Sequence, residues 1–316
     1  MKRKLYAALA IFAAGAVALG LQNTLVAQTP TKMKVAYTAT SDFASGFVAA
    51  ESGFFKKRGL DVEFQLIPLN STMPAALQSG SIDLAGTTLP VFLQAVDSGL
   101  DLVAIAGSGS TLPSDQNFGI VVKSDVTIAK PDDYAGKRIG VPGLGAFLHV
   151  LFQNWLIEKG VDIKKVTFVE VSFPQMADVL RAGNVDGVIT GEPIMSRIVQ
   201  ANIGKVATYF NEVLKGEMPI IVYSSTRKWL NENKAAAKAF REAIAEGVQN
   251  VRKDDNFLRE SIGKYIKLPP EVLKTMPING QWRAEIPQQN MARWIEIMEK
   301  QKMLRTKLDL KKLVAE

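Results

Sequence analysis

The chain has 316 residues, of which 47% are hydrophobic and 22% charged, so it can bury a sizeable core in one large domain or two lobes. Its formal net charge of +7 is spread along the chain without a basic tail, which argues against nucleic-acid binding. The absence of cysteine excludes disulfides, iron–sulfur clusters, thiolate zinc sites and a lipidated cysteine anchor.

The N-terminal segment has the pattern of a secretory signal. Lys2, Arg3 and Lys4 form a positive region, and residues 5–21 follow as an uncharged, mostly apolar run. Small residues around Ala27 predict cleavage after that residue, so that 1–27 is a signal peptide; an uncleaved anchor is the alternative. Cleavage would lower the net charge to +4, because three cations and no anions leave. No second hydrophobic run reaches the length of a membrane span, so we expect a soluble exported protein.

Strands and helices alternate in the next part of the chain. Residues 33–38 form an apolar run, and Phe47, Ala50 and Phe54 then recur at helical spacing until Gly59 ends the helix. Further strands and helices are expected, in turn, over 60–68, 72–80, 82–85, 89–97 and 102–106. This alternation is typical of right-handed βαβ units and a mainly parallel sheet.

A second α/β series begins at residues 118–123, an apolar segment interpreted as the strand that crosses into a second lobe. Residues 219–224 should form the return crossing, and the tail after them is helical. A chain that leaves one lobe and later returns makes a two-segment hinge with a cleft between the lobes. We therefore predict lobe 1 over 28–117 and 225–316, and lobe 2 over 118–224.

Four stretches carry a family resemblance. They are Ala50 to Glu63, Leu77 to Asp83, Gly136 to Pro142, and Leu180 to Asp186 before the Glu192-Pro193 pair. In this order, behind a signal segment, they resemble the periplasmic solute-binding proteins of ABC importers of the nitrate, sulfonate and taurine type, which are related to binding proteins for thiamine pyrimidine precursors.

The resemblance implies an α/β, two-lobed periplasmic-binding-protein fold of type II-like topology, with mainly parallel sheets and two hinge crossovers. It also implies a periplasmic monomer that docks an ABC transporter permease and needs no cofactor or metal. Many relatives carry an aromatic residue where this chain has Gly191, so the resemblance does not assign the substrate.

Ligand-binding residues are expected where strands end, because loop amides and helix N-termini converge there in open α/β sheets. Hydroxyl and backbone N–H groups suit an oxyanion, so the expected solute is a sulfonate, a carboxylate or nitrate-like. The candidates are Thr40, Ser41, Asp42, Phe43, Asn70, Thr87, Thr88, Ser108 and Ser110 in the first lobe, and Gly145, Ala146, His149, Phe173 and Glu192 in the second.

Several of these residues have two interpretations. The turn from Gly143 to Ala146 before a helix is either an anion cradle or a plain strand-to-helix turn. His149, the only histidine, either bonds a ligand or is a packed or capping residue, and its being alone excludes a two-histidine metal site. Glu192 either accepts a ligand N–H or ties the lobes together, or else accepts from loop amides.

The remaining candidates also have structural alternatives. Asp42 could face the ligand or act as a helix N-cap, and Phe43 and Phe173 could sandwich the ligand or belong to the core. Asp83 and Asp186 match the family pattern but are expected to bind loop backbone.

The leading hypothesis is a binding protein that captures a solute without reaction. One alternative is an enzyme on the same fold, similar to the thiamine-pyrimidine-precursor synthases, which use an active-site histidine and iron; a signal segment and a single histidine argue against it. Another is an extracytoplasmic sensor, which would need an uncleaved anchor or a fused signalling domain.

Overall fold

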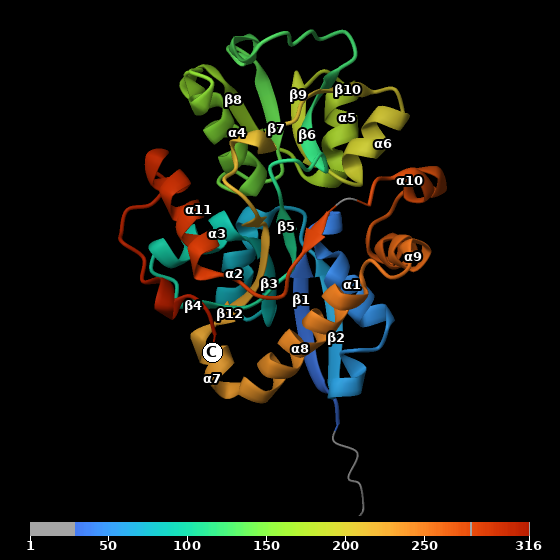
Figure 1. The fold of residues 1–316 in the computed structure, drawn as a ribbon, viewed down its shortest axis with the longest axis vertical. Coiled ribbons are helices and arrows are strands. Elements are labelled where there is room, and N and C mark those ends of the chain that lie inside the picture. The colour runs from blue at the N-terminus through green and yellow to red at the C-terminus, as the bar shows by residue number, and fades with distance from the viewer. Residues whose placement is uncertain (1–28, 279, 316) are drawn as a thin grey trace, which may run out of the picture.

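A computed structural model describes residues 29–278 and 280–315. The chain forms two α/β lobes stacked one above the other, each built on its own five-stranded sheet (Figure 1). The predicted signal peptide lies outside the described residues. Within residues 29–278 and 280–315, no helix combines the length and apolar character needed to cross a membrane.

Lobe 1 is built on a sheet with strand order β2-β1-β3-β12-β4. Four strands run in one direction, and β12 alone is antiparallel to its neighbours β3 and β4. The elements of this lobe are β1 Thr31–Tyr37, α1 Ala44–Glu51, β2 Leu60–Leu66, α2 Met73–Gln78, β3 Leu84–Thr88, α3 Leu89–Asp97, β4 Leu102–Gly107, β12 Ile221–Thr226, α7 Arg227–Glu232, α8 Lys234–Asn250 and α9 Asp255–Tyr265.

Lobe 2 repeats the arrangement with strand order β10-β6-β9-β7-β8. Here β6 is the reversed strand, antiparallel to β10 and β9, while β7 pairs with β8 and β9 in parallel. The elements are β6 Phe118–Lys123, β7 Arg138–Val141, α4 Phe147–Glu158, β8 Thr167–Glu170, α5 Met176–Arg181, β9 Gly187–Gly191, α6 Ile194–Gln200 and β10 Gly204–Thr208.

A small sheet and the C-terminal tail lie where the lobes meet. The sheet has the order β11-β5-β13 and is formed by β5 Gly109–Thr111, β11 Met218–Pro219 and β13 Gln281–Trp282. In the tail, α10 (Pro270–Thr275) lies against α6, and α11 (Gln288–Lys300) packs on α3 and α4 (Figure 1). The tail therefore contacts both lobes.

The predicted fold class is confirmed, with mainly parallel sheets and two passages of the chain between them. The parallel strands β3 and β4 are buried along their whole length, as expected when helices cover both faces of a sheet. The return strand β12 begins at Ile221 inside the first sheet, so the predicted lobe boundary at 224 falls within it. The lobe limits stay a prediction.

One predicted helix was too long. α1 ends at Glu51 instead of Gly59, because Gly53 adopts a left-handed φ of +72° just after the C-cap residue Ser52. A separate 3-10 turn, Lys56–Arg58, follows, and Gly59 at φ +71° ends that turn. The sequence contained both stop signals, and the first one ended the helix.

Gly247 marks the close approach of α8 to α1, and its replacement gives a test of this packing. A Cβ at Gly247 would lie 2.2 Å from the Ser45 backbone oxygen, which cannot move without displacing α1. We expect Gly247→Ala to lower the free energy of unfolding by about 1–3 kcal/mol, although helix propensity alone would raise it by about 1 kcal/mol.

The matched control is Gly263→Ala in α9, where the Cβ would meet the flexible end of Leu273 at 2.7 Å. This side chain can shift, so we expect the free energy of unfolding to stay within about 1 kcal/mol of the parent value. Urea unfolding of both variants makes the comparison. Equal effects of the two substitutions would contradict the close α1–α8 packing.

Candidate functional site

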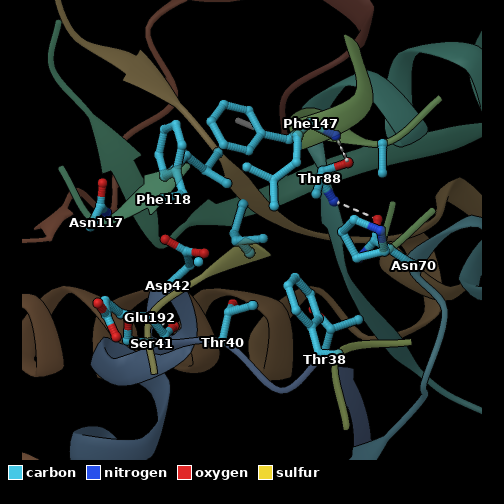
Figure 2. A pocket seen from close by; sticks show the side chains of 17 residues that line it. Thr38, Thr40, Ser41, Asp42, Asn70, Thr88, Asn117, Phe118, Phe147 and Glu192 are labelled. Carbon is cyan, nitrogen blue, oxygen red and sulfur yellow. Dashed lines mark hydrogen bonds between the residues drawn. The ribbon is translucent and has the colours of Figure 1, made fainter. Parts of the chain in front are cut away.

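A cavity lies between the two lobes, at the edges where their sheets face each other (Figure 2). It encloses about 480 Å³, including its opening to solvent. Its lining comes from both lobes and consists of Thr38, Thr40, Ser41, Asp42, Asn70, Thr88, Asn117, Phe118, Pro142, Ala146, Phe147, Leu148, Phe173, Gly191, Glu192, Ile220 and Ile221.

Strand ends supply this lining in two ways. The parallel strands contribute residues at or just after their carboxyl ends, such as Thr38 after β1, Thr88 at the end of β3 and Glu192 after β9. The reversed strands β6 and β12 contribute their first residues, Phe118 and Ile221, to the same edge. Both sheets therefore present one continuous set of side chains to the cavity.

Asp42 is the carboxyl group that faces the cavity from lobe 1 (Figure 2). It lies in the 3-10 turn that leads into α1, and protein surrounds it closely enough to raise its pKa to about 6 by desolvation. The Thr40 hydroxyl beside it opposes this shift in part, without forming a well-aligned hydrogen bond. An ionised Asp42 is thus held in an unfavourable environment.

Glu192 is the carboxyl group of lobe 2, and it is buried. Burial raises its pKa, and an N–H from Ser196 to Oε2 at 3.2 Å opposes the rise. Its backbone oxygen also accepts hydrogen bonds from the N–H and the hydroxyl of Ser41, at 3.1 and 3.2 Å. The residue therefore both lines the cavity and joins the lobes, and a cis peptide links it to Pro193.

Three amides in and just after the turn before α4 donate to other groups of the protein. The Leu144 N–H donates to Glu170 Oε1 at 2.8 Å, the Gly145 N–H to His149 Nδ1 at 2.9 Å, and the Phe147 N–H to Thr88 Oγ1 at 3.2 Å. The protein's own acceptors occupy the positions that an anion would take. The geometry favours the plain strand-to-helix turn over the anion cradle.

His149 lies behind this turn, outside the cavity lining. Burial lowers its pKa to about 4, so the imidazole is neutral at physiological pH and can accept the Gly145 N–H. Its ring packs edge-on against Phe168, with ring centroids 4.6 Å apart. These contacts fit the packed or capping interpretation.

The structure brings eight of the fourteen predicted ligand residues into the lining. These are Thr40, Ser41, Asp42, Asn70, Thr88, Ala146, Phe173 and Glu192. The other six are Phe43, Thr87, Ser108, Ser110, Gly145 and His149, which lie next to the lining without forming it. No ligand is present, so the roles of all fourteen stay predictions.

Two of the six use their hydroxyl groups to bond other parts of the protein. The Ser108 hydroxyl donates to the backbone oxygen of Asp42 at 2.8 Å, and the Ser110 hydroxyl donates to Glu217 at 2.7 Å. Ser108 thus holds the loop that carries Asp42. Phe43, by contrast, is fully buried in the core of lobe 1.

Asn70 lines the cavity but uses its amide for the protein itself. Its Nδ2 donates to the Gly86 oxygen at 3.2 Å, and its Oδ1 accepts the Thr88 N–H at 2.8 Å.

The sequence predicted that Asp83 and Asp186 bind loop backbone, and both do. Asp83 accepts the N–H of Lys34 at 2.8 Å in lobe 1, and Asp186 accepts the N–H of Arg138 at 2.7 Å in lobe 2.

Sequence reasoning missed nine lining residues, most of them apolar. The nine are Thr38, Asn117, Phe118, Pro142, Phe147, Leu148, Gly191, Ile220 and Ile221. Those from β6 and β12 were missed because the search covered only the carboxyl ends of strands. The crossings at 118 and 219 were the signal that could have found them.

Among these residues, Asn117 is only 4% exposed, and its Oδ1 has no hydrogen-bond partner. Buried polar groups are almost always paired, so an unpaired amide oxygen at a cavity indicates a position for a ligand atom or water. Among the described residues, no group of three or more His, Cys, Asp or Glu side chains could hold a metal ion.

Comparison with known proteins identifies the family. The profile of the NMT1/THI5-like family matches residues 40–256, which is more than half of the chain. The chain belongs to this family.

Curated relatives of this family member include proteins whose names describe binding. A nitrate/nitrite binding protein from Nostoc sp. is 26% identical over 72% of this chain and 55% of the relative, so the chain spans about half of that protein. A taurine-binding periplasmic protein from Escherichia coli is 22% identical over 86% of this chain and 82% of the relative.

Solved structures agree on the fold. An alkanesulfonate-binding protein from Xanthomonas axonopodis, bound to MOPS, superposes with a TM-score of 0.76 at 18% identity, covering 90% of this chain and 98% of that one. A periplasmic nitrate-binding protein from Synechocystis gives a TM-score of 0.77, also at 18% identity, covering 90% of this chain and 86% of that one. The fold is therefore that of periplasmic binding proteins.

The raised pKa of Asp42 predicts how stability depends on pH. A folded-state pKa of about 6 against an ordinary 3.8 means that the folded protein holds this proton more tightly, so the contribution of Asp42 to stability falls as pH rises from about 4 through 6. We expect Asp42→Asn to raise the free energy of unfolding at pH 8 by roughly 2–3 kcal/mol, and to lose most of this gain by about pH 4.

Chemical denaturation of both proteins from pH 4 to pH 8 measures this difference. Other groups near the cavity, Glu192 and the neighbouring Tyr209, titrate in both proteins, so they cancel to first order in the comparison. A gain that does not vary with pH would show that desolvation of Asp42 is not its source.

Proposed function

We propose that the protein is the periplasmic substrate-binding component of an ABC importer, which captures a small organic solute between its lobes and delivers it to the permease. The observation that carries this proposal is the cavity itself. Both lobes line it, and it contains two carboxyl groups and a buried amide whose oxygen has no partner. Such a site can bind and release a solute, and it needs no reaction.

Closure of the lobes is the proposed binding step. The hydrogen bonds that span the seam include Ser41 to Glu192, Ser71 to Glu170 at 2.9 Å, and Gln94 to Gly145 at 2.8 Å. The bonds at the seam exist only when the lobes are together, so a ligand that contacts both lobes adds to them and favours the closed form.

The exported location follows from the same proposal. A signal peptide over 1–27 would deliver the chain to the periplasm, and a monomer would leave its surface free to dock the permease. Relatives named as nitrate-, taurine- and alkanesulfonate-binding proteins support this role. The lobe limits predicted from the sequence describe the two bodies that would close.

A binding experiment tests the function. We expect the purified protein, residues 28–316, to bind one equivalent of a small solute reversibly in isothermal titration and to show a higher melting temperature with it. Chromatography of the released compound should recover it unchanged. Conversion of the compound during incubation would identify an enzyme and overturn the proposal.

The Ser71 bond to Glu170 offers a test of closure. Ser71 lies outside the cavity lining, so Ser71→Ala removes a seam contact without touching the ligand site. We expect ligand affinity to fall about three- to tenfold, because one hydrogen bond to a carboxylate no longer favours the closed form.

The matched control is Ser79→Ala, whose hydroxyl bonds only nearby residues of its own loop. We expect this variant to keep the parent affinity in isothermal titration. Small-angle scattering with and without ligand would give the lobe separation of each protein. A Ser71→Ala protein that binds as tightly as its parent would exclude this bond from the closing seam.

A further inference from the structure

The charge of the cavity lining is opposite to that expected for an anion site. Its ionisable side chains are Asp42 and Glu192, and among the described residues that line it there is no lysine, arginine or histidine. An anion entering this space would meet two carboxyl groups and no compensating cation. The sequence had led us to expect an anionic solute, and the lining supplies no cationic side chain to bind one.

Several backbone donors around the cavity are already bonded within the protein. The amides of the turn before α4 are bonded to Glu170, His149 and Thr88, as described above. At the other strand ends, the Ser41 N–H is bonded to Glu192, and the Thr88 N–H to Asn70. These five amides are therefore already paired, while the Thr40 hydroxyl in the lining has no partner.

Acceptors, by contrast, are left over. The Asn117 Oδ1 is buried without a partner, and it lies near Asp42 and Glu192 at one end of the cavity (Figure 2). One oxygen of Glu192 accepts from Ser196, and the Thr40 hydroxyl beside the Asp42 carboxyl group does not form a well-aligned bond to it. The carboxyl oxygens at this end can therefore accept further hydrogen bonds.

The opposite side of the cavity is apolar. Phe118 and Phe147 lie across from Asp42 (Figure 2), and the lining also contains the aliphatic side chains of Leu148, Ile220 and Ile221. Burial of a ring or short alkyl chain there would be favourable, in proportion to the apolar area removed from water. The cavity thus has one acidic, acceptor-rich end and one apolar end.

We propose that this cavity, in the binding role proposed above, selects a small solute that carries a protonated amine or an N–H-rich nitrogen group on an apolar body. The nitrogen group donates to Asp42, Glu192 and the Asn117 oxygen, and the apolar body packs against the two phenylalanines. Desolvation of the carboxyl groups is compensated only when such a donor arrives.

Matched probes with one apolar body test this selection. We expect benzylamine to raise the melting temperature of the protein, benzamide to raise it less, and benzoate and phenylmethanesulfonate to leave it unchanged. Butylamine and butanesulfonate repeat the comparison with a flexible body, and nitrate and taurine serve as small ionic probes. Stabilisation by an anion but by no nitrogen donor overturns the proposal, as does the absence of a shift with any amine or amide.

Two variants locate the selectivity. We expect Asp42→Asn and Glu192→Gln each to lower the affinity for the stabilising amine at least tenfold, while changing affinity for an uncharged isostere such as benzyl alcohol by less than threefold. This split distinguishes a charge contact from general damage, which would weaken both probes. Asp125→Asn, an equal charge change on the exposed surface of lobe 2, should leave both affinities unchanged.

The outcomes separate this inference from the proposed function. Tight, reversible binding of a sulfonate or carboxylate would leave a binding protein and overturn only the nitrogen selectivity. Binding of an amine followed by its chemical conversion would keep the selectivity and overturn the role in transport. Equal loss of amine and alcohol affinity in Asp42→Asn would show that this carboxyl group does not contact the ligand's charge.

Discussion

The reversed strand in each sheet is the constraint on which the site depends. β12 enters the first sheet and β6 the second in the direction opposite to their neighbours. A strand that arrives from the other lobe must begin at the edge facing that lobe, whereas the parallel strands end there. At each crossing, the first residues of the reversed strand therefore lie beside the last residues of the parallel strands. The two sheet edges formed in this way are the walls of one cavity.

The seam between the lobes uses hydrogen-bond donors that could otherwise reach a ligand. Helix N-termini bind anions when their N–H groups are free. Around the start of α4, the N–H groups of Leu144, Gly145 and Phe147 are bonded to Glu170, His149 and Thr88. The turn thus serves the structure of the closed form, and the proposed polar selection rests on the carboxyl groups of the cavity.

Local sequence patterns predicted many elements because apolar runs and glycine stops act within a few residues, as along residues 102–106, although Gly53 ended α1 before the expected stop at Gly59. They also placed Asp42 and Glu192 in the lining. They could not show whether an amide after a strand is free, since the partners of Gly145 and Leu144 come from later helices and strands. Nor could they show that β6 and β12 run backwards, because strand direction depends on pairing between distant segments.

The cost of Asp42 connects stability with selection. A carboxyl group whose pKa is raised from 3.8 to about 6 makes the folded protein less stable at neutral pH by roughly 2–3 kcal/mol than an unperturbed one would. Asparagine has almost the same shape and would avoid this cost. A charged carboxyl group at such a position is explained if a ligand neutralises it. The cost of desolvation is already present in the empty protein, and a hydrogen-bond donor of the ligand relieves it on binding. The same carboxyl group that weakens the empty protein therefore makes the cavity selective.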